Sequence, residues 1–151
     1  MLHPKRLLSL LLVFAICWWT VPSALAADMV SAAGNTVNMR SGPGTGYAAQ
    51  WTVDRGYPFK VVARKGKWLK VTDFVHDSGW VYAPMINKIR HYIVSARSAT
   101  LRAGSNARSA VVFRAGKGDV LRTLGQRGRW VQVRHERDPV GWVAKSSVWG
   151  W

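Results

Sequence analysis

The sequence predicts an all-β protein built from two consecutive copies of one small domain. Three observations lead to this prediction. The chain matches itself at a constant offset of 62 residues. Within each copy, short apolar segments alternate with glycine-marked turns, which is typical of β-sandwiches and β-barrels. No stretch beyond the first 26 residues keeps the 3.6-residue apolar period of an amphipathic helix, so we expect little helix.

The first 26 residues have the features of a secretory signal peptide. Lys5 and Arg6 give a positive start, segment 7–19 is almost entirely apolar, and residues 24–26 form a small-x-small cleavage pattern. The apolar segment is shorter than the roughly 20 residues of a membrane-spanning helix, so an uncleaved anchor is the less favoured alternative. We therefore expect cleavage after Ala26, a periplasmic or extracellular location, and no transmembrane segment in the mature chain.

Removal of this segment leaves a strongly basic chain without cysteine. Cys17 is the single cysteine and leaves with the signal, which excludes a disulfide, a thiol nucleophile and a cysteine metal ligand. Of 22 Lys and Arg, 20 remain with all 7 Asp and Glu, so the mature net charge is +13. This charge favours an anionic partner surface, with solubility alone as the alternative. Because an exported protein does not meet nucleic acid, we expect cell-wall carboxylates, lipid phosphates or lipopolysaccharide instead.

The internal repeat needs no gap between residues 36 and 86. The matching residues are Arg40 and Arg102, Gly42 and Gly104, Gly56 and Gly118, Gly66 and Gly128, Trp68 and Trp130, and Gly79-Trp80-Val81 and Gly141-Trp142-Val143. We divide the chain into a signal peptide (1–26), repeat 1 (27–87), a short linker (88–92) and repeat 2 (93–151). Because a 60-residue domain buries only about 60% of its unfolded surface, we expect the repeats to pair in a fixed or semi-fixed way. A monomer is the favoured oligomeric state.

The segment around the first tryptophan of each pair predicts a half-buried strand. In 67–71, Leu69 and Val71 alternate with Trp68 and Lys70, so the two aliphatic side chains should face the core. The second copy repeats the pattern in 130–133. Lys65-Gly66-Lys67 and Arg127-Gly128-Arg129 predict turns before these strands, and the glycine-rich segment 41–46 predicts a loop.

Taken in order, these motifs resemble the bacterial SH3-like (SH3b) domain. The first copy carries Val37-Asn38-Met39-Arg40-Ser41-Gly42-Pro43-Gly44, Tyr47, Gly56, Gly66-x-Trp68-x-x-Val71 and Gly79-Trp80-Val81. The second copy carries Leu101-Arg102-Ala103-Gly104, Gly118, Gly128-x-Trp130-x-x-Val133 and Gly141-Trp142-Val143, but has Ser105, Asn106 and Ser109 in the loop. The resemblance implies two tandem, strongly bent, five-stranded SH3-like β-barrels. It also implies binding to cell-wall peptidoglycan or to a protein partner.

Catalysis is not expected, because the mature chain lacks a recognisable constellation of catalytic residues. His76 and His135 stand next to acids in the loops before the Gly-Trp-Val motifs, but two ligands do not make a metal site, and we interpret both as solvated. The segment 42–46 lacks the Lys-Ser/Thr that follows in a phosphate loop. We predict no enzyme activity, no metal and no cofactor.

Aromatic and basic side chains are the candidates for ligand binding. The selected residues are Arg40, Tyr47, Trp51, Lys67, Trp68, Trp80, Tyr82, Arg129, Trp130 and Trp142. Trp68 and Trp130 are expected opposite the core, where they either bind ligand or pack between the repeats. Packing is the favoured role of Trp80 and Trp142, and capping of the final strand that of Trp149 and Trp151. Arg40 and Arg102 either hold the glycine loop or present charge to a ligand.

These expectations combine into one leading function and one alternative. The leading hypothesis is an exported, non-catalytic module that binds peptidoglycan or another anionic envelope component through aromatic and basic grooves. The alternative is an SH3-type adaptor that binds an envelope enzyme or a secretion or assembly complex. The divergent loop of the second copy makes the first copy the better candidate for binding.

Overall fold

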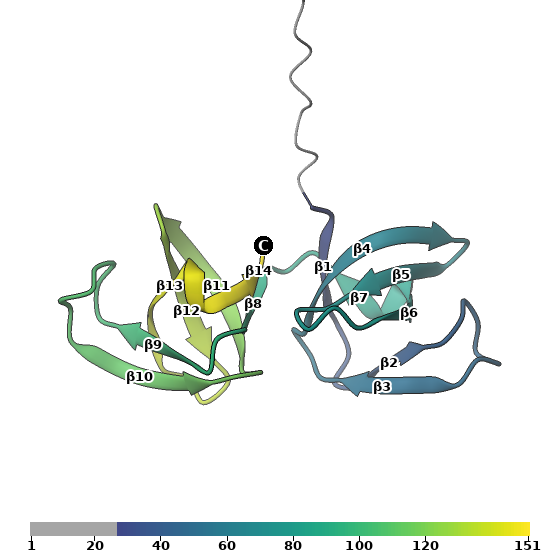
Figure 1. Ribbon diagram of the computed structural model, residues 1–151, viewed down its shortest axis with the longest axis horizontal. Helices are drawn as coiled ribbons and strands as arrows, with labels where there is room; N and C mark the ends of the chain where they lie inside the picture. The colour runs from purple at the N-terminus through teal and green to yellow at the C-terminus, as the bar shows by residue number, and fades with distance from the viewer. Residues whose placement is uncertain (1–26) are drawn as a thin grey trace, which may run out of the picture.

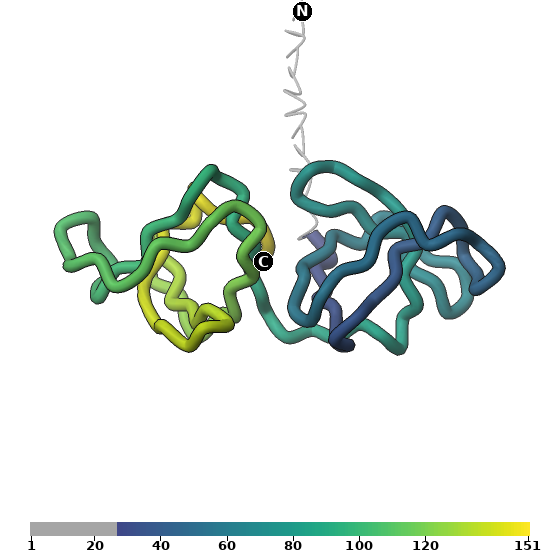
Figure 2. The backbone as a smooth tube through the Cα atoms, turned by 90° about the horizontal axis from the view of Figure 1, so that it is seen from below, coloured from purple at the N-terminus to yellow at the C-terminus, as the bar shows by residue number. Residues whose placement is uncertain are grey.

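The computed structural model describes residues 27–151, which form two β-barrels (Figure 1). The expected signal peptide, residues 1–26, and its cleavage after Ala26 lie outside the described residues. Figure 2 shows one crossing of the chain from the first barrel to the second. Each sheet curves around its own core, as the repeat in the sequence predicts.

The first barrel contains seven strands and one single-turn helix. They are β1 (Met29–Ala32), β2 (Val37–Arg40), β3 (Ala49–Val53), β4 (Pro58–Lys65), β5 (Trp68–Thr72), β6 (Ser78–Tyr82), the 3-10 helix η1 (Ala83–Met85) and β7 (Ile86–Asn87). The sheet order is β3-β2-β6-β5-β4-β1-β7. Neighbouring strands are antiparallel.

The second barrel repeats this arrangement element by element. Its parts are β8 (His91–Val94), β9 (Ser98–Arg102), β10 (Val111–Gly116), β11 (Val120–Arg127), β12 (Trp130–His135), β13 (Val140–Ala144), the 3-10 helix η2 (Lys145–Ser147) and β14 (Val148–Gly150). The order β10-β9-β13-β12-β11-β8-β14 is the same topology. The all-β prediction and the low helix content are confirmed. The five strands per barrel that the resemblance implied are corrected to seven, because a leading strand and a short closing strand pair at one edge of each sheet.

Alternation along β5 and β12 places the apolar side chains as expected. Leu69 and Val71 are buried while Trp68 is only partly buried. Val131 and Val133 are buried in the same way beside Trp130. The turns before these strands contain Gly66 and Gly128 at φ of 56° and 55°, a left-handed conformation that glycine adopts without steric penalty.

Two separate hydrophobic cores stabilise the barrels. The core of the first barrel includes Met39, Phe59 and Val81, each at most 1% exposed. That of the second includes Leu101 and Leu121, which are fully buried. Because no residue belongs to both clusters, each barrel has its own apolar interior.

The junction between the barrels is shorter than the sequence indicated. Strand β7 ends at Asn87 and β8 begins at His91, so β8 takes in the last residues of the segment 88–92 that was assigned to the linker. The buried His91 ring packs against the β3–β4 turn of the first barrel, where a Cβ on Gly56 would stand 2.8 Å from Cδ2 of His91. The Lys88 ammonium donates to the Asp28 carboxylate and to the Met29 carbonyl oxygen, at 2.9 Å for the carbonyl. These contacts tie the junction to the start of β1.

Candidate functional site

A groove on the first barrel brings together three of the residues selected from the sequence. It is a cavity of about 210 Å³, and Arg40, Trp68 and Tyr82 line it with Asn38, Thr45 and Met85. The lining comes from β2, the loop after it, the start of β5, and the β6–η1 corner.

Two aromatic rings form one wall of this groove. Trp68 and Tyr82 are cross-strand partners in β5 and β6, so their side chains leave the sheet on the same face. Their ring centroids are 5.3 Å apart at an interplanar angle of 48°. Tyr82 remains 36% exposed. The pair therefore offers an apolar surface to solvent, outside the hydrophobic core.

Arg40 holds the glycine-rich loop that borders the groove. Its Nη1 donates to the carbonyl oxygen of Tyr47 at 2.7 Å and to that of Thr45 at 3.3 Å. Arg102 repeats the first bond in the second barrel, where Nη1 donates to the carbonyl of Ser109 at 2.9 Å. Of the two roles that the sequence left open, holding the loop is the one both arginines perform.

Tyr47 folds back onto the same loop and does not line the groove. A Cβ on Gly42 would stand 2.3 Å from the Tyr47 ring, so the close approach requires glycine. The Tyr47 side chain is 50% exposed. Trp51 lies on β3 at 41% exposure, also outside the groove lining.

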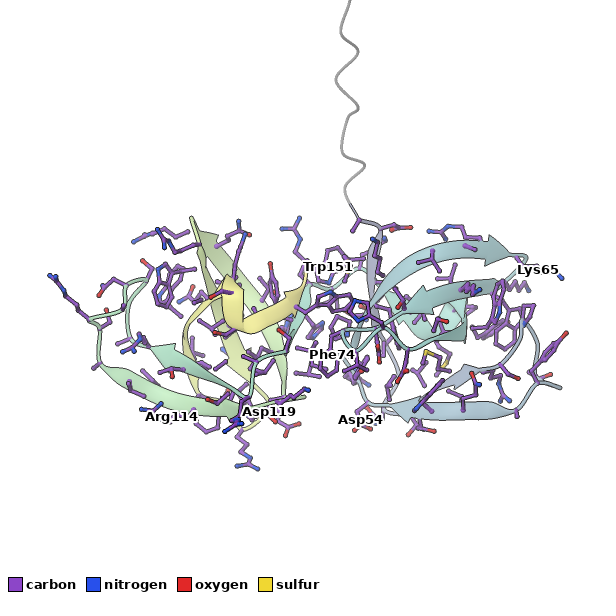
Figure 3. All side chains as sticks on the ribbon, viewed as in Figure 1. Asp54, Lys65, Phe74, Arg114, Asp119 and Trp151 are labelled. Atoms are coloured by element: carbon purple, nitrogen blue, oxygen red, sulfur yellow. The ribbon has the colours of Figure 1, made fainter. Side chains whose placement is uncertain are left out.

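Several basic residues besides Arg40 lie on the strands and turns near the groove but do not line it. Trp80 pairs across strands with both Lys70 and Arg40, so this ring lies between two cationic residues. Lys67 is exposed in the turn before β5, and its carbonyl accepts the N–H of Ala83 at 2.9 Å, which fixes the turn against the β6–η1 corner. Figure 3 shows Lys65, the cross-strand partner of Trp68, at the end of the first barrel away from the second. Trp68 therefore does not pack between the barrels.

The corresponding face of the second barrel lacks half of the aromatic wall. Trp130 pairs with Ala144 where Trp68 pairs with Tyr82. Trp142 lies under the guanidinium of Arg127, whose Cζ is 5.6 Å from the ring centroid. Arg129 is exposed in the turn before β12. Its carbonyl oxygen accepts the Lys145 N–H at 2.9 Å, which fixes the turn in the same way as the Lys67 carbonyl does in the first barrel. The second barrel thus keeps the framework but loses one ring of the groove.

Family models match the two barrels separately. One model of the bacterial SH3 domain matches residues 33–88 and another matches residues 97–148. The chain belongs to the bacterial SH3 domain family. The first barrel is SH3 domain 1 and the second is SH3 domain 2, in tandem, as the resemblance predicted.

Among curated proteins, the chain is similar to the putative N-acetylmuramoyl-L-alanine amidase YrvJ of Bacillus subtilis. The two are 21% identical over 123 residues, which cover 74% of this chain and 24% of that protein. The chain therefore spans about a quarter of the length of this relative. Two solved structures, NlpC2 and NlpC1 from Trichomonas vaginalis, cover 82% and 85% of this chain and 48% and 47% of their own chains. Their identities are 8% and 10% and their TM-scores 0.37 and 0.38, too low to establish a common architecture.

Each SH3 domain has one partly buried polar pair at the same place, with different chemistry. In SH3 domain 1 the Tyr57 hydroxyl donates to Asp73 Oδ2 at 3.0 Å, and Asp73 Oδ1 accepts the backbone N–H groups of Val75 and Asp77 at 3.0 and 2.9 Å. Burial, followed by the neighbouring Asp73 carboxylate, raises the pKa of Tyr57. The Asp73 carboxylate therefore organises the loop between β5 and β6.

In SH3 domain 2 the donor and the acceptor exchange positions. The positions of Tyr57 and Asp73 are occupied by Asp119 and His135, whose Oδ2 and Nε2 are 3.1 Å apart. The Nδ1 of His135 accepts the Arg137 N–H, so Nε2 carries the proton and donates to Asp119. His135 is 2% exposed, so the expectation of a solvated histidine was wrong. His76, in contrast, is exposed in its loop, as expected.

Trp151 is the aromatic residue that lies between the domains. It packs against the core of SH3 domain 2 and accepts the Tyr92 hydroxyl at its carbonyl oxygen, which confirms that it caps the last strand. Figure 3 shows it on the side of SH3 domain 2 that faces SH3 domain 1. Lys88 and Arg90 of the junction lie over its ring, each 5.8 Å from the centroid. These junction contacts were not predicted from the sequence.

Within residues 27–151, no three His, Cys, Asp or Glu side chains form a group that could hold a metal ion. The same part of the chain contains no helix with the length and apolar character needed to cross a membrane.

Proposed function

We propose that the chain is an exported, non-catalytic binding module that holds peptidoglycan or another anionic envelope component in the groove of SH3 domain 1. The observation that carries this proposal is the solvent-facing Trp68–Tyr82 pair in a cavity that Arg40 also lines. Aromatic rings provide a large, rigid apolar surface for a sugar or a peptide. Arg40 in the lining and the exposed Lys67 and Lys70 nearby provide cationic partners for carboxylates.

Two further facts support a cell-wall ligand. The full chain has a net charge of +15, which favours anionic surfaces. The similar protein from Bacillus subtilis is named as a putative N-acetylmuramoyl-L-alanine amidase, and such a protein acts on the wall. We extend only the wall association to this chain, together with an extracytoplasmic location.

The test is co-sedimentation of the purified protein with peptidoglycan sacculi at low salt. We expect the protein in the pellet. Trp68→Ala should weaken binding about tenfold, because central aromatic residues dominate interface energies. Trp130→Ala is the matched control: the same residue type at the same fold position, but opposite Ala144 instead of a tyrosine, so its binding should stay close to wild type.

Circular dichroism of each variant checks that the barrels remain folded. Wild-type protein that stays in the supernatant would contradict the wall-binding function. In that case, crosslinking in cells that recovers one stoichiometric protein partner would favour the adaptor function.

A further inference from the structure

Two arginines, one from each SH3 domain, line a small cleft where the domains meet. The cleft has a volume of about 160 Å³ and is lined by Arg55, Asn87, Ile89, His91 and Arg122. Arg55 lies in the β3–β4 turn, Asn87 ends β7, and Arg122 lies on β11. None of the five lining residues carries a carboxylate, so the cleft is positively charged.

SH3 domain 2 concentrates basic side chains here beyond what the fold requires. Arg122 pairs across strands with His91 of β8 on one side and with Arg134 of β12 on the other. Like charges placed directly opposite each other destabilise a sheet. At the equivalent positions of SH3 domain 1, Lys60 pairs with Met29 and Thr72, which leaves one cation in the row. The row of cations is therefore a feature of SH3 domain 2 and of the cleft beside it.

The polar groups of the cleft have hydrogen-bond donors to spare. Arg55 uses Nε for the Asn35 side-chain oxygen at 3.0 Å, which leaves its two terminal amino groups. Asn87 uses Oδ1 to accept the Ile89 N–H at 3.0 Å, which leaves its amide NH2. In the part of the chain that the structure describes, Arg122 makes no hydrogen bond or ion pair with another side chain. The Nδ1 of His91 is occupied by the Ile89 carbonyl at 3.0 Å.

Two acidic side chains line a cavity that adjoins the cleft. An adjoining cavity of about 220 Å³ shares Arg55, His91 and Arg122 with the cleft and also reaches Glu136 and Asp138. Asp138 pairs with Arg134, with Nη1 and Oδ1 3.5 Å apart. Asp138 is therefore paired with Arg134, whereas Arg55 and Arg122 form no ion pair within residues 27–151.

We propose that this cleft binds a phosphate group, held by the guanidinium groups of Arg55 and Arg122 and by the amide of Asn87. Guanidinium groups match the oxygens of phosphate in paired hydrogen bonds. Donors that line one cleft from three separate elements suit a tetrahedral anion with several oxygens better than a planar carboxylate. The phosphate would be a soluble phosphate ester or the headgroup of a phospholipid. This site is separate from the aromatic groove and does not depend on the function proposed there.

A phosphate in this cleft joins the domains, because it takes one arginine from each. Bound phosphate should therefore raise the thermal stability of both domains together, since a ligand that binds only the folded state stabilises it by mass action.

The test is isothermal titration calorimetry of inorganic phosphate into the protein, purified with its natural N-terminus, at low ionic strength. We expect saturable binding with one site per chain. The double variant R55Q/R122Q should lose at least about tenfold in affinity, because each arginine supplies charge-assisted hydrogen bonds. The matched control R97Q/R108Q removes the same charge from two exposed arginines outside the cleft and should stay within about twofold of wild type. An absence of saturable binding, or an equal loss in both double variants, would overturn the proposal.

A second measurement distinguishes the two sources of phosphate. Vesicles that contain phosphatidylglycerol are sedimented with wild type and with both double variants. If R55Q/R122Q loses vesicle binding as well as phosphate binding, the site takes a lipid headgroup. If only phosphate binding is lost, the site takes a soluble ester.

Discussion

Removal of the Asp73 carboxylate should destabilise SH3 domain 1 selectively. Asp73 is 7% exposed and accepts three hydrogen bonds: from the Tyr57 hydroxyl at 3.0 Å, the Val75 N–H at 3.0 Å and the Asp77 N–H at 2.9 Å. In Asp73→Ala these three donors lose their acceptor. A hydrogen bond to a charged group contributes about 1.5–3 kcal/mol, and the half-buried tyrosine and the loop amides recover part of this from water. We expect the free energy of unfolding of SH3 domain 1 to fall by about 3 kcal/mol.

Native-state hydrogen exchange measures this loss in each domain separately. Amides of β5 should exchange on the order of 100-fold faster in Asp73→Ala, because about 1.4 kcal/mol corresponds to a factor of ten. Amides of β12 should be unchanged, because the two domains have separate cores. Asp73→Asn should lose less, because its Oδ1 still accepts the two backbone N–H groups. Asp77→Asn is the charge control and should be close to wild type. Exchange that accelerates equally in β5 and β12, or not at all, would refute this account.

Two further predictions concern the contact between the domains. Gly56→Ala should destabilise the protein more than Gly66→Ala in thermal unfolding. Both glycines have positive φ, at 85° and 56°, so each alanine adds about 1–2 kcal/mol of backbone strain, but only a Cβ at Gly56 would collide with the His91 ring. An equal effect of the two substitutions would contradict the packing of His91 against Gly56. Burial, opposed by the Ile89 carbonyl and assisted by the Arg122 charge, lowers the pKa of His91. As pH falls, the unfolded chain therefore takes up the proton first, and the free energy of unfolding should decrease below about pH 6.5. The His91→Gln variant should show a smaller decrease when the free energy of unfolding is measured by urea unfolding at several pH values. The same pH dependence in the variant and the wild type would disprove the assignment to His91.

Local signals in the sequence were sufficient to predict the framework of both domains. The alternation around Trp68 and Trp130 reports burial directly, because neighbouring residues in a strand face opposite sides of the sheet. The glycines before these strands mark turns, because their left-handed backbone disfavours other residues. The constant offset then carried each assignment from one copy to the other.

The candidate site was predicted only in part, because it depends on strand register. Nothing near Trp68 in the sequence indicates that Tyr82 is its cross-strand partner, although the offset pairs Tyr82 with Ala144 and so marks a difference between the copies. Ligand binding by the residues selected from the sequence stays a prediction. The cleft at the domain junction was not predicted, since its residues come from segments that only the tertiary structure brings together.

The prediction that His135 is solvated failed because it relied on residues that are neighbours in the sequence. The acids beside it, Glu136 and Asp138, suggested an exposed charged loop, whereas its partner is Asp119, sixteen residues earlier. The 62-residue offset contained a signal that could have corrected this, because it aligns His135 with Asp73 and Asp119 with Tyr57. In each copy, the two residues at these positions can form a hydrogen bond with each other.

The pairing of the first and last strands determines how each domain responds to mechanical tension. β1 and β7 are antiparallel neighbours, with Ser31 opposite Asn87, and β8 and β14 are paired in the same way, with Tyr92 opposite Gly150. The chain therefore enters and leaves each domain at nearly the same point. A pulling force applied through the backbone acts at that point. In SH3 domain 1 the ion pair between Lys88 and Asp28 joins the two ends there. The force would separate the edge strands one hydrogen bond at a time. The core of the barrel carries no load until this ion pair and the edge strands separate.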